Sequence, residues 1–300
     1  MERKYSFHKE KVRLIIGESN YQKKQRLSWH KNLYLFLRFD YVFVIIACAL
    51  SLIPYILIFV ASFCSSVNIR KGNLLSGISI SDFTNNWNTL TRDGNFFKAF
   101  TNSIFVTLIT TILGLLIAGM AGYAYIVYRN KLTNKLFYLS FFSIMIPSSV
   151  TLVPLFILLQ KLHMLNSLFT VILTSLSLPF LIYLFRQNTK LFPKELVKSA
   201  RVDGLSELGI FFLVFIPNMS SVFVTAGIIL FIDTWNSLLF PLIIIQSQEK
   251  MTLSVYINSI GSSYTSDYGA FMLALSLATL PIILLFIVVQ KHFRMGMRGI

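Results

Sequence analysis

Residues 193–204 read Pro-Lys-Glu-Leu-Val-Lys-Ser-Ala-Arg-Val-Asp-Gly, a polar segment of mixed charge between two strongly apolar regions. Pro193 suits the first position of a helix, because its missing N–H would have no partner there. Asp203-Gly204 supplies a turn, since glycine accepts the left-handed backbone that ends helices. Ser206-Glu207 can start a second helix, with a hydroxyl cap and an acid near its positive end. A narrow apolar stripe at helical spacing marks the first helix: Leu196, Val197 and Ala200.

The composition around this segment is typical of a membrane protein. Apolar residues make up 55% of the 300 residues, charged residues 13%, and the mean hydropathy is +0.68. A soluble domain of this length could not bury that many apolar side chains. Cys48 and Cys64 are too few for a disulfide framework, and the four histidines lack the paired spacing of metal ligands. The phosphate loop G-x-x-x-x-G-K-[ST] is also absent. We therefore expect no catalytic residue, no metal site and no cofactor bound by this chain.

Six apolar stretches are close to, or longer than, the roughly 20 residues that a helix needs to cross the hydrocarbon layer. The second stretch is over-long, which indicates that it tilts or extends beyond the bilayer. A further apolar run at 238–245 contains Pro241 and is too short to cross, so we expect it at the outer surface or re-entering the protein. The predicted fold class is all-α, a polytopic membrane protein with transmembrane helices at about 41–63, 100–128, 136–159, 166–185, 210–232 and 271–290.

Basic residues predict the orientation of these helices, because cytoplasmic loops carry an excess of lysine and arginine. Of the 27 Lys and Arg, ten lie in residues 1–40, three in 129–135, five in 186–209 and three after residue 290, whereas the alternate loops carry six. We therefore expect a plasma-membrane protein with both termini and the 186–209 loop in the cytoplasm. The formal charge of +15 then favours contact with anionic membrane lipid and not with nucleic acid.

Four regions follow from this topology. The basic N-terminal region is too long for the charged start of a signal peptide, and the apolar run after it is longer than a signal core, so we expect a retained tail. The regions are a basic cytoplasmic tail at 1–40, the first transmembrane helix and an extracytoplasmic segment at 41–99, a transmembrane core with the 186–209 loop at 100–290, and a cytoplasmic tail at 291–300.

The segment that ends at Gly204 resembles the cytoplasmic coupling loop, or EAA loop, of the membrane subunits of ATP-binding-cassette (ABC) importers. In that family a Glu-Ala-Ala triplet precedes an Asp-Gly pair, and an apolar run ending in Leu-Pro follows. This chain has Lys198-Ser199-Ala200, Asp203-Gly204 and Ile216-Pro217 in the same order. Lysine and serine replace the glutamate and the first alanine of the family, which changes the charge presented to a partner.

Further motifs occur in family order along most of the chain. Together they resemble the second permease of maltose-type and related sugar importers. They are Asn102-Ser103, Gly122-Tyr123-Ala124-Tyr125, Ile146-Pro147, Trp235-Asn236, Pro241-Leu242, Thr252-Leu253 and Gln290-Lys291-His292-Phe293.

The resemblance implies a permease subunit that works by alternating access and performs no covalent chemistry. Its implied partners are a second homologous permease, two cytosolic ATP-binding subunits that use ATP and Mg, and an extracellular solute-binding protein. The residues implied to couple this chain to the ATPase are Glu195, Lys198, Ser199, Ala200, Asp203 and Gly204.

A second set of residues consists of candidates for the substrate path or its gate. Trp235-Asn236 could stack on a sugar and bond its hydroxyls, or could anchor the chain at the membrane interface. Asp233 is either an acceptor for sugar hydroxyls or a solvated charge just past the apolar run. Prolines within the spans are either gate hinges or static kinks. The candidates are Asn102, Pro147, Asn218, Asp233, Trp235 and Asn236.

The predicted spans also indicate the class of cargo, because all six lack Asp, Glu, Lys, Arg and His. Holding a charged molecule near the bilayer centre without a counter-charge costs several kcal/mol or more. Hydroxyls, amides and aromatic rings suit a neutral sugar or oligosaccharide instead. The alternatives are a permease for peptides, amino acids or oxyanions and, in a different class, a membrane-embedded enzyme or a receptor. Acid–base or metal chemistry would need ionisable groups that these spans lack.

The predicted topology places Ser206 in the cytoplasm. In a chain whose Cys48 and Cys64 are replaced by serine, Ser206→Cys should resist a membrane-impermeant maleimide in intact cells and should react after permeabilisation. Lys250→Cys, in a predicted outer loop, is the positive control. Labelling of S206C in intact cells would contradict the orientation.

Overall fold

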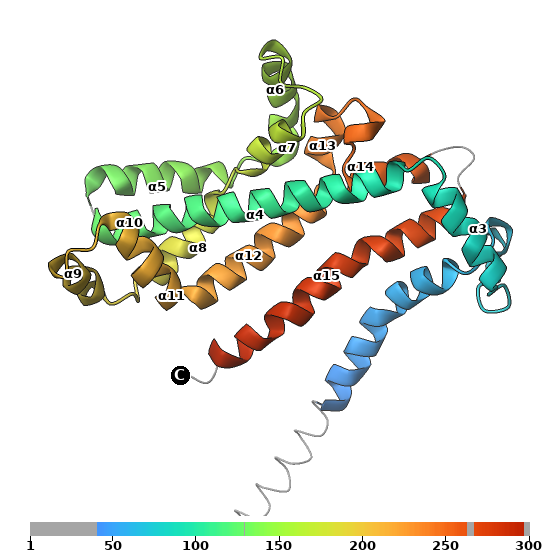
Figure 1. The fold of residues 1–300 in the computed structure, drawn as a ribbon, viewed down its shortest axis with the longest axis horizontal. Coiled ribbons are helices and arrows are strands. Elements are labelled where there is room, and N and C mark those ends of the chain that lie inside the picture. The colour runs from blue at the N-terminus through green and yellow to red at the C-terminus, as the bar shows by residue number, and fades with distance from the viewer. Residues whose placement is uncertain (1–40, 129, 263–266, 297–300) are drawn as a thin grey trace, which may run out of the picture. The chain divides into compact units, whose positions relative to one another are not determined.

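The structure is a computed structural model that describes residues 41–128, 130–262 and 267–296 (Figure 1). It divides into two compact units, Met1–Leu57 and Ile58–Ile300, and the division falls inside a helix over Tyr41–Ala61. The predicted tail at 1–40 lies outside the described residues, as do residues 297–300 of the predicted C-terminal tail. The described part of the first unit is helix throughout, and the second unit holds every other element.

No strand occurs among the described residues, which confirms the all-α class. Most of the second unit is α-helix, with one π-helical turn (η1) and one 3₁₀ turn (η2). In chain order the elements are α2 (Ser66–Arg70), α3 (Ile80–Thr91), α4 (Asn95–Val127), α5 (Lys131–Ser143), α6 (Ser148–Lys161), α7 (Leu168–Ser175), α8 (Pro179–Thr189), α9 (Lys194–Val202), α10 (Glu207–Ile210), η1 (Phe211–Phe215), α11 (Ile216–Asn218), α12 (Ser220–Trp235), α13 (Leu239–Ile244), η2 (Gln248–Lys250), α14 (Leu253–Gly261) and α15 (Tyr268–Gly296).

Three helices in the described ranges are long and apolar enough to cross a membrane alone: Tyr41–Ala61, Asn95–Tyr125 and Tyr268–Gln290. Three further candidates are helix pairs bent at a short break, namely α5 with α6 by 102°, α7 with α8 by 42°, and Glu207–Asn218 with α12 by 85°. Counting each pair as one span gives the six spans that were predicted. The third, fourth and fifth spans are each broken by a sharp bend, whereas the other three are single helices.

A proline stands at or near each break. Pro147 caps the start of α6 after a short non-helical turn, and its ring disfavours a helical backbone at the residue before it. Pro179 stands in the first turn of α8, directly after the second break. Pro217 lies in α11, between the π-helical turn and the bend at Met219. Pro154, by contrast, stays inside α6. That these breaks act as gate hinges stays a prediction.

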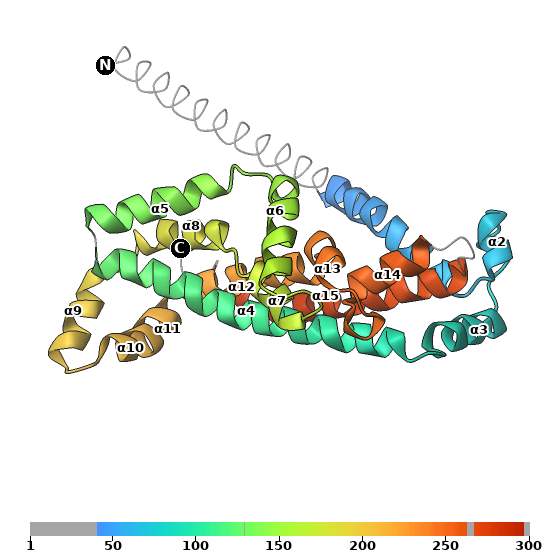
Figure 2. The ribbon, with the colours of Figure 1, turned by 90° about the horizontal axis from the view of Figure 1, so that it is seen from above.

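Helix α4 packs against more of the other elements than any other helix in the described chain. It is 33 residues long and unbroken, about 50 Å at the helical rise, so it exceeds a hydrocarbon layer of about 30 Å. Helices α7, α8 and α12 lie along it (Figure 1, Figure 2). A Cβ added at Gly122 would lie 2.7 Å from Cβ of Phe185, and one at Gly119 would lie 2.6 Å from the ring of Phe223. These two glycines therefore allow α8 and α12 to approach α4 closely.

Polar contacts join α3 and the adjacent end of α4 to distant parts of the chain. The amide of Asn86 in α3 donates to the carbonyls of Ser62 and Cys64, at 2.9 and 3.1 Å. The hydroxyl of Ser103 in α4 accepts the N–H of Leu253 at 2.7 Å. The 238–245 run forms α13, a six-residue helix that packs on α7 and is too short to cross a membrane.

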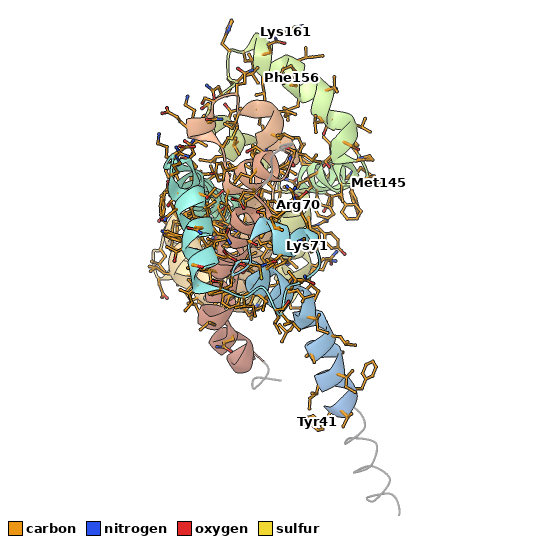
Figure 3. The ribbon with its side chains drawn as sticks, turned by 90° about the vertical axis from the view of Figure 1, so that its right-hand side faces the viewer. Tyr41, Arg70, Lys71, Met145, Phe156 and Lys161 are labelled. Carbon is orange, nitrogen blue, oxygen red and sulfur yellow. The ribbon has the colours of Figure 1, made fainter. Side chains whose placement is uncertain are left out.

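Helix α6 projects away from the bundle, and Phe156 and Lys161 lie toward its outer, C-terminal end (Figure 3). Many of its apolar side chains have no protein neighbour to bury them, and Val150, Val153 and Leu158 are more than half exposed, at 64%, 62% and 52%. An apolar face of this size belongs against lipid or another protein.

Candidate functional site

Helix α9 and the turn after it form the segment predicted from residues 193–204. Pro193 is the N-cap of α9, one position before the site predicted for it. The predicted turn is confirmed, because Gly204 has a φ of +84°. Its N–H donates to the carbonyl of Arg201 and that of Leu205 donates to the carbonyl of Ala200, both at 3.0 Å. These two bonds satisfy the last carbonyls of the helix, in a geometry that glycine adopts without strain.

One face of α9 is packed into the protein. Val197 and Ala200 are buried, whereas Leu196, the third residue of the predicted stripe, is 38% exposed. The hydroxyl of Ser206 accepts the N–H of Gly209 at 3.2 Å and so starts α10, as predicted. The buried apolar cluster beneath these residues joins α4, α9 and the π-helical region: Tyr123, Phe192, Val197, Ala200, Ile210, Phe211, Phe215 and Met219.

Glu207 links this segment to α4 through one carboxylate. Its Oε2 accepts the hydroxyl of Tyr123 at 2.6 Å, and its Oε1 accepts Nε of Arg201 at 2.7 Å. The hydrogen bond to Glu207 raises the pKa of the Arg201 guanidinium above its ordinary value. The ring of Tyr123 also packs on Phe211 and Phe215, with centroids 5.9 and 5.4 Å away. The α9–α10 turn is thus attached to the end of the longest helix in the described chain.

The sequence alone does not indicate this link. Glu207 is expected at a helix start and Tyr123 in a family motif, and the two residues are 84 positions apart. A tyrosine at the end of an apolar span and an acid after a turn are each ordinary, so no local pattern pairs them.

The opposite face of α9 is open. Five of the six predicted coupling residues are exposed, and only Ala200 is buried. Lys198 and Asp203 make no salt bridge with any described residue. Beside them Leu191 and Val202 are 86% and 88% exposed. Apolar side chains standing among unpaired charges are typical of a surface that another protein covers.

A second cationic contact lies where α4, α5 and α8 meet. The predicted 186–209 loop begins inside α8, because Arg186 is a helical residue. Its guanidinium lies 3.6 Å from the centre of the Phe137 ring and 5.0 Å from that of Tyr125. Its Nη2 donates to Oδ1 of Asn134 at 2.7 Å. A guanidinium held between aromatic faces fixes these three helices together.

Three of the predicted path residues make hydrogen bonds to backbone carbonyls within the chain. The amide of Asn102 donates to the carbonyls of Glu249 and Met251, at 2.9 and 3.0 Å. The indole of Trp235 is 3% exposed and donates to the carbonyl of Ala278 at 3.1 Å. The amide of Asn218 donates to the carbonyl of Val214 at 2.7 Å. These hydrogen bonds account for the three polar side chains without any ligand. A role of the three residues in the substrate path stays a prediction.

The other three path residues lie closer to open space. Pro147 stands at the α5–α6 break. Asn236 is the exposed C-cap of α12, in a cavity of about 560 Å³ that Trp235 also lines. Asp233 lies inside α12, not past its end, and α12 belongs to the fifth candidate span. The fifth span therefore extends beyond residue 232, its predicted end, and includes an ionisable residue that the predicted bounds left outside. The structure brings the six coupling residues together, but it spreads the path residues over several elements.

Within the described ranges, no group of three or more His, Cys, Asp or Glu side chains is placed to hold a metal ion. The site consists of an exposed face on α9 that is connected through Glu207 to α4.

The sequence matches the family described as binding-protein-dependent transport system inner membrane component over residues 110–299. It is 33% identical over 260 residues to the lactose transport system permease protein LacG of Rhizobium radiobacter, covering 87% of this chain and 94% of the relative. It is 37% identical over 202 residues to the arabinooligosaccharides transport system permease protein AraQ of Bacillus subtilis, covering 67% and 72%.

A third relative is the melibiose/raffinose/stachyose import permease protein MelC of Bacillus subtilis, 27% identical over 256 residues, with 84% of this chain and 91% of the relative covered. Among solved structures, the fold is similar to a chain of a bacterial ABC transporter involved in the import of the acidic polysaccharide alginate. The TM-score is 0.74 at 22% identity, over 86% of this chain and 96% of that chain.

The turn at Gly204 generates a local stability prediction. Gly204→Val should loosen α9, because a left-handed backbone costs a non-glycine residue about 1–2 kcal/mol and valine most of all. Amide hydrogen exchange in α9 should become about 5- to 30-fold faster. Gly204→Asn is the matched control, since asparagine tolerates this conformation, and it should leave exchange within a few-fold of the wild type. Unchanged exchange in G204V would show that the turn does not hold α9.

Proposed function

The chain belongs to the binding-protein-dependent transport system inner membrane component family, and from this premise we propose that it is a permease subunit of an ABC importer for a neutral sugar or oligosaccharide. It is a multi-pass membrane protein of a non-enzymatic class. The observation that carries the proposal is the exposed face of α9, which is tied through Glu207 to Tyr123 on the helix that runs the length of the core.

The names of the relatives support the class of cargo. LacG is named for lactose, AraQ for arabinooligosaccharides, and MelC for melibiose, raffinose and stachyose. All of these are uncharged glycans that present hydroxyl groups. The described spans offer this chain mainly hydroxyls, amides and aromatic rings, which exchange hydrogen bonds with sugars at modest desolvation cost.

The proposed importer contains a second homologous permease, two cytosolic ATP-binding subunits and an extracellular solute-binding protein. The open face of α9 is suited to an ATP-binding subunit, since it combines exposed apolar residues with unpaired charges. Because Lys198 replaces the glutamate of the family, the partner surface opposite it should be acidic or neutral. The apolar face of α6 is suited to the second permease or to lipid.

The proposed orientation places α9 and both termini in the cytoplasm. It rests on the distribution of basic residues, which are concentrated in the tail and in the loops on the α9 side. The ATP-binding subunits, which use ATP and Mg, would then dock on the cytoplasmic side. This chain itself is proposed to bind no cofactor.

The proposed mechanism is alternating access. Closure of the ATP-binding subunits would move α9, and the Glu207 carboxylate would pass the displacement to Tyr123 at the end of α4. Because α4 is unbroken, its far end moves with it, where Asn102 and Ser103 hold the segment around η2 and α14. Helices packed closely on α4 then rock with it as a body.

Uptake by the complete importer in liposomes tests the proposal. With its solute-binding protein and ATP, the importer should accumulate at least one of lactose, arabinotriose or raffinose, and a non-hydrolysable ATP analogue should abolish accumulation. Uptake of phosphate, an amino acid or a charged peptide with no uptake of neutral glycans would overturn the sugar assignment and leave the importer assignment standing.

A further inference from the structure

A cavity of about 490 Å³ lies where several broken or ending helices meet. Its walls come from the α5–α6 break, the α7–α8 break, the C-terminal end of α12 and the start of α13. A second cavity of about 400 Å³ adjoins it, and both volumes suit a small molecule. The lining residues that the two cavities share are Ser143, Ile146, Ser177, Pro179 and Asp233.

Asp233 is the only ionisable residue in the described lining of either cavity. Its side chain is exposed and makes no hydrogen bond or ion pair with any described residue. A carboxylate on a membrane-spanning helix is too costly to leave against lipid, so such groups face a water-filled space or a polar partner. This side of α12 therefore faces the transported molecule or the water around it.

Several hydroxyls around Asp233 are acceptors toward the cavity. Thr151 donates its proton to the carbonyl of Ser148 at 2.9 Å, Thr174 to that of Thr170 at 3.0 Å, and Ser175 to that of Val171 at 2.8 Å. A hydroxyl that has given its proton to its own helix offers only lone pairs to the cavity. Together with the Asp233 carboxylate, these three hydroxyls suit the hydrogen-bond donors of a ligand.

Thr234 is a second, independent indication that the cavity is a ligand site. It lines the larger cavity and is only 7% exposed, and its Oγ1 has no hydrogen-bond partner among the described residues. A buried hydroxyl without a partner is uncommon, because it loses its bonds to water and gains nothing in return. A ligand or water in the cavity would supply the partner.

We propose that this cavity is a subsite for a neutral glycan, in which the Asp233 carboxylate accepts hydrogen bonds from sugar hydroxyls and excludes acidic sugars. The inference rests on the proposed function and deepens it, since it assigns part of the glycan contact to this chain and sets its charge preference. Ile146, Leu155 and Phe240 give the cavity an apolar side on which the C–H face of a sugar can lie.

The chemistry of the lining separates glycans by charge. A uronate would bring a second carboxylate beside Asp233, and no Lys, Arg or His lines either cavity to offset the repulsion. A neutral sugar uses both the carboxylate and the lone pairs of the surrounding hydroxyls.

Uptake by the complete importer with Asp233 variants is the first test. Asp233→Ala should lower the uptake rate of the glycan that the wild type carries by about tenfold or more, because a hydrogen bond to a charged group is lost. Asp233→Asn keeps one acceptor oxygen and should fall in between. Asp93→Asn is the matched control, since it neutralises an exposed carboxylate that lines neither cavity. Co-purification of the ATP-binding subunit confirms that each variant assembles.

Protection of a cysteine in the cavity is the second test. In a chain with Cys48 and Cys64 replaced by serine, Ser237→Cys places a thiol in the lining. Lactose, arabinotriose or raffinose should slow its modification by a small maleimide several-fold, trigalacturonate should not, and Asp233→Ala should abolish the protection.

The outcomes keep the two proposals apart. If the wild type imports a neutral glycan while D233A imports it at the same rate and no sugar protects the thiol, the subsite is overturned and the importer function stands. If trigalacturonate protects as well as the neutral sugars, the charge preference is overturned. If the wild type imports none of the neutral glycans, the proposed function itself fails and this inference fails with it.

Discussion

The hydrogen bond between the hydroxyl of Tyr123 and the carboxylate of Glu207 is the contact on which the proposed mechanism depends. The two oxygen atoms lie 2.6 Å apart. The bond joins a helix inside the apolar core to the turn that follows the exposed segment α9. The same carboxylate holds Arg201 of α9, so the segment is attached at two points through one side chain. The buried cluster beneath it adds apolar packing around this polar link. A force on the open face of α9 therefore has a direct route into α4.

The second constraint is the bilayer, which demands that broken helices satisfy their polar groups internally. Pro147, Pro179 and Pro217 interrupt three spans, yet α4 and α15 stay continuous and give those spans a frame. Two of the breaks, with the end of α12, enclose the cavity around Asp233. The breaks that cost backbone hydrogen bonds are thus the places where the chain can present polar groups to a ligand inside the membrane.

Local features of this fold could be predicted from the sequence, and distant contacts could not. The turn at Gly204 follows from one glycine and its neighbours, and the number of spans follows from runs of apolar residues. The breaks were expected only as kinks, because a proline marks a position without fixing an angle. The bonds of Asn102 join residues about 150 positions apart. Asp233 was placed past its helix because a charge ends an apolar run in sequence, whereas in the structure a cavity accommodates it inside the helix.

The central claim is that α9, α10 and the adjoining end of α4 move as one body. Spin labels at Leu208 in α10 and Ile117 in α4, both exposed, would report the distance between them in the complete importer. The distance should be the same with and without bound ATP, while a label pair on Ile117 and α6, at Val153, should change. A distance between Leu208 and Ile117 that shifts with nucleotide would show that the coupling segment slides over α4, and the account would be wrong.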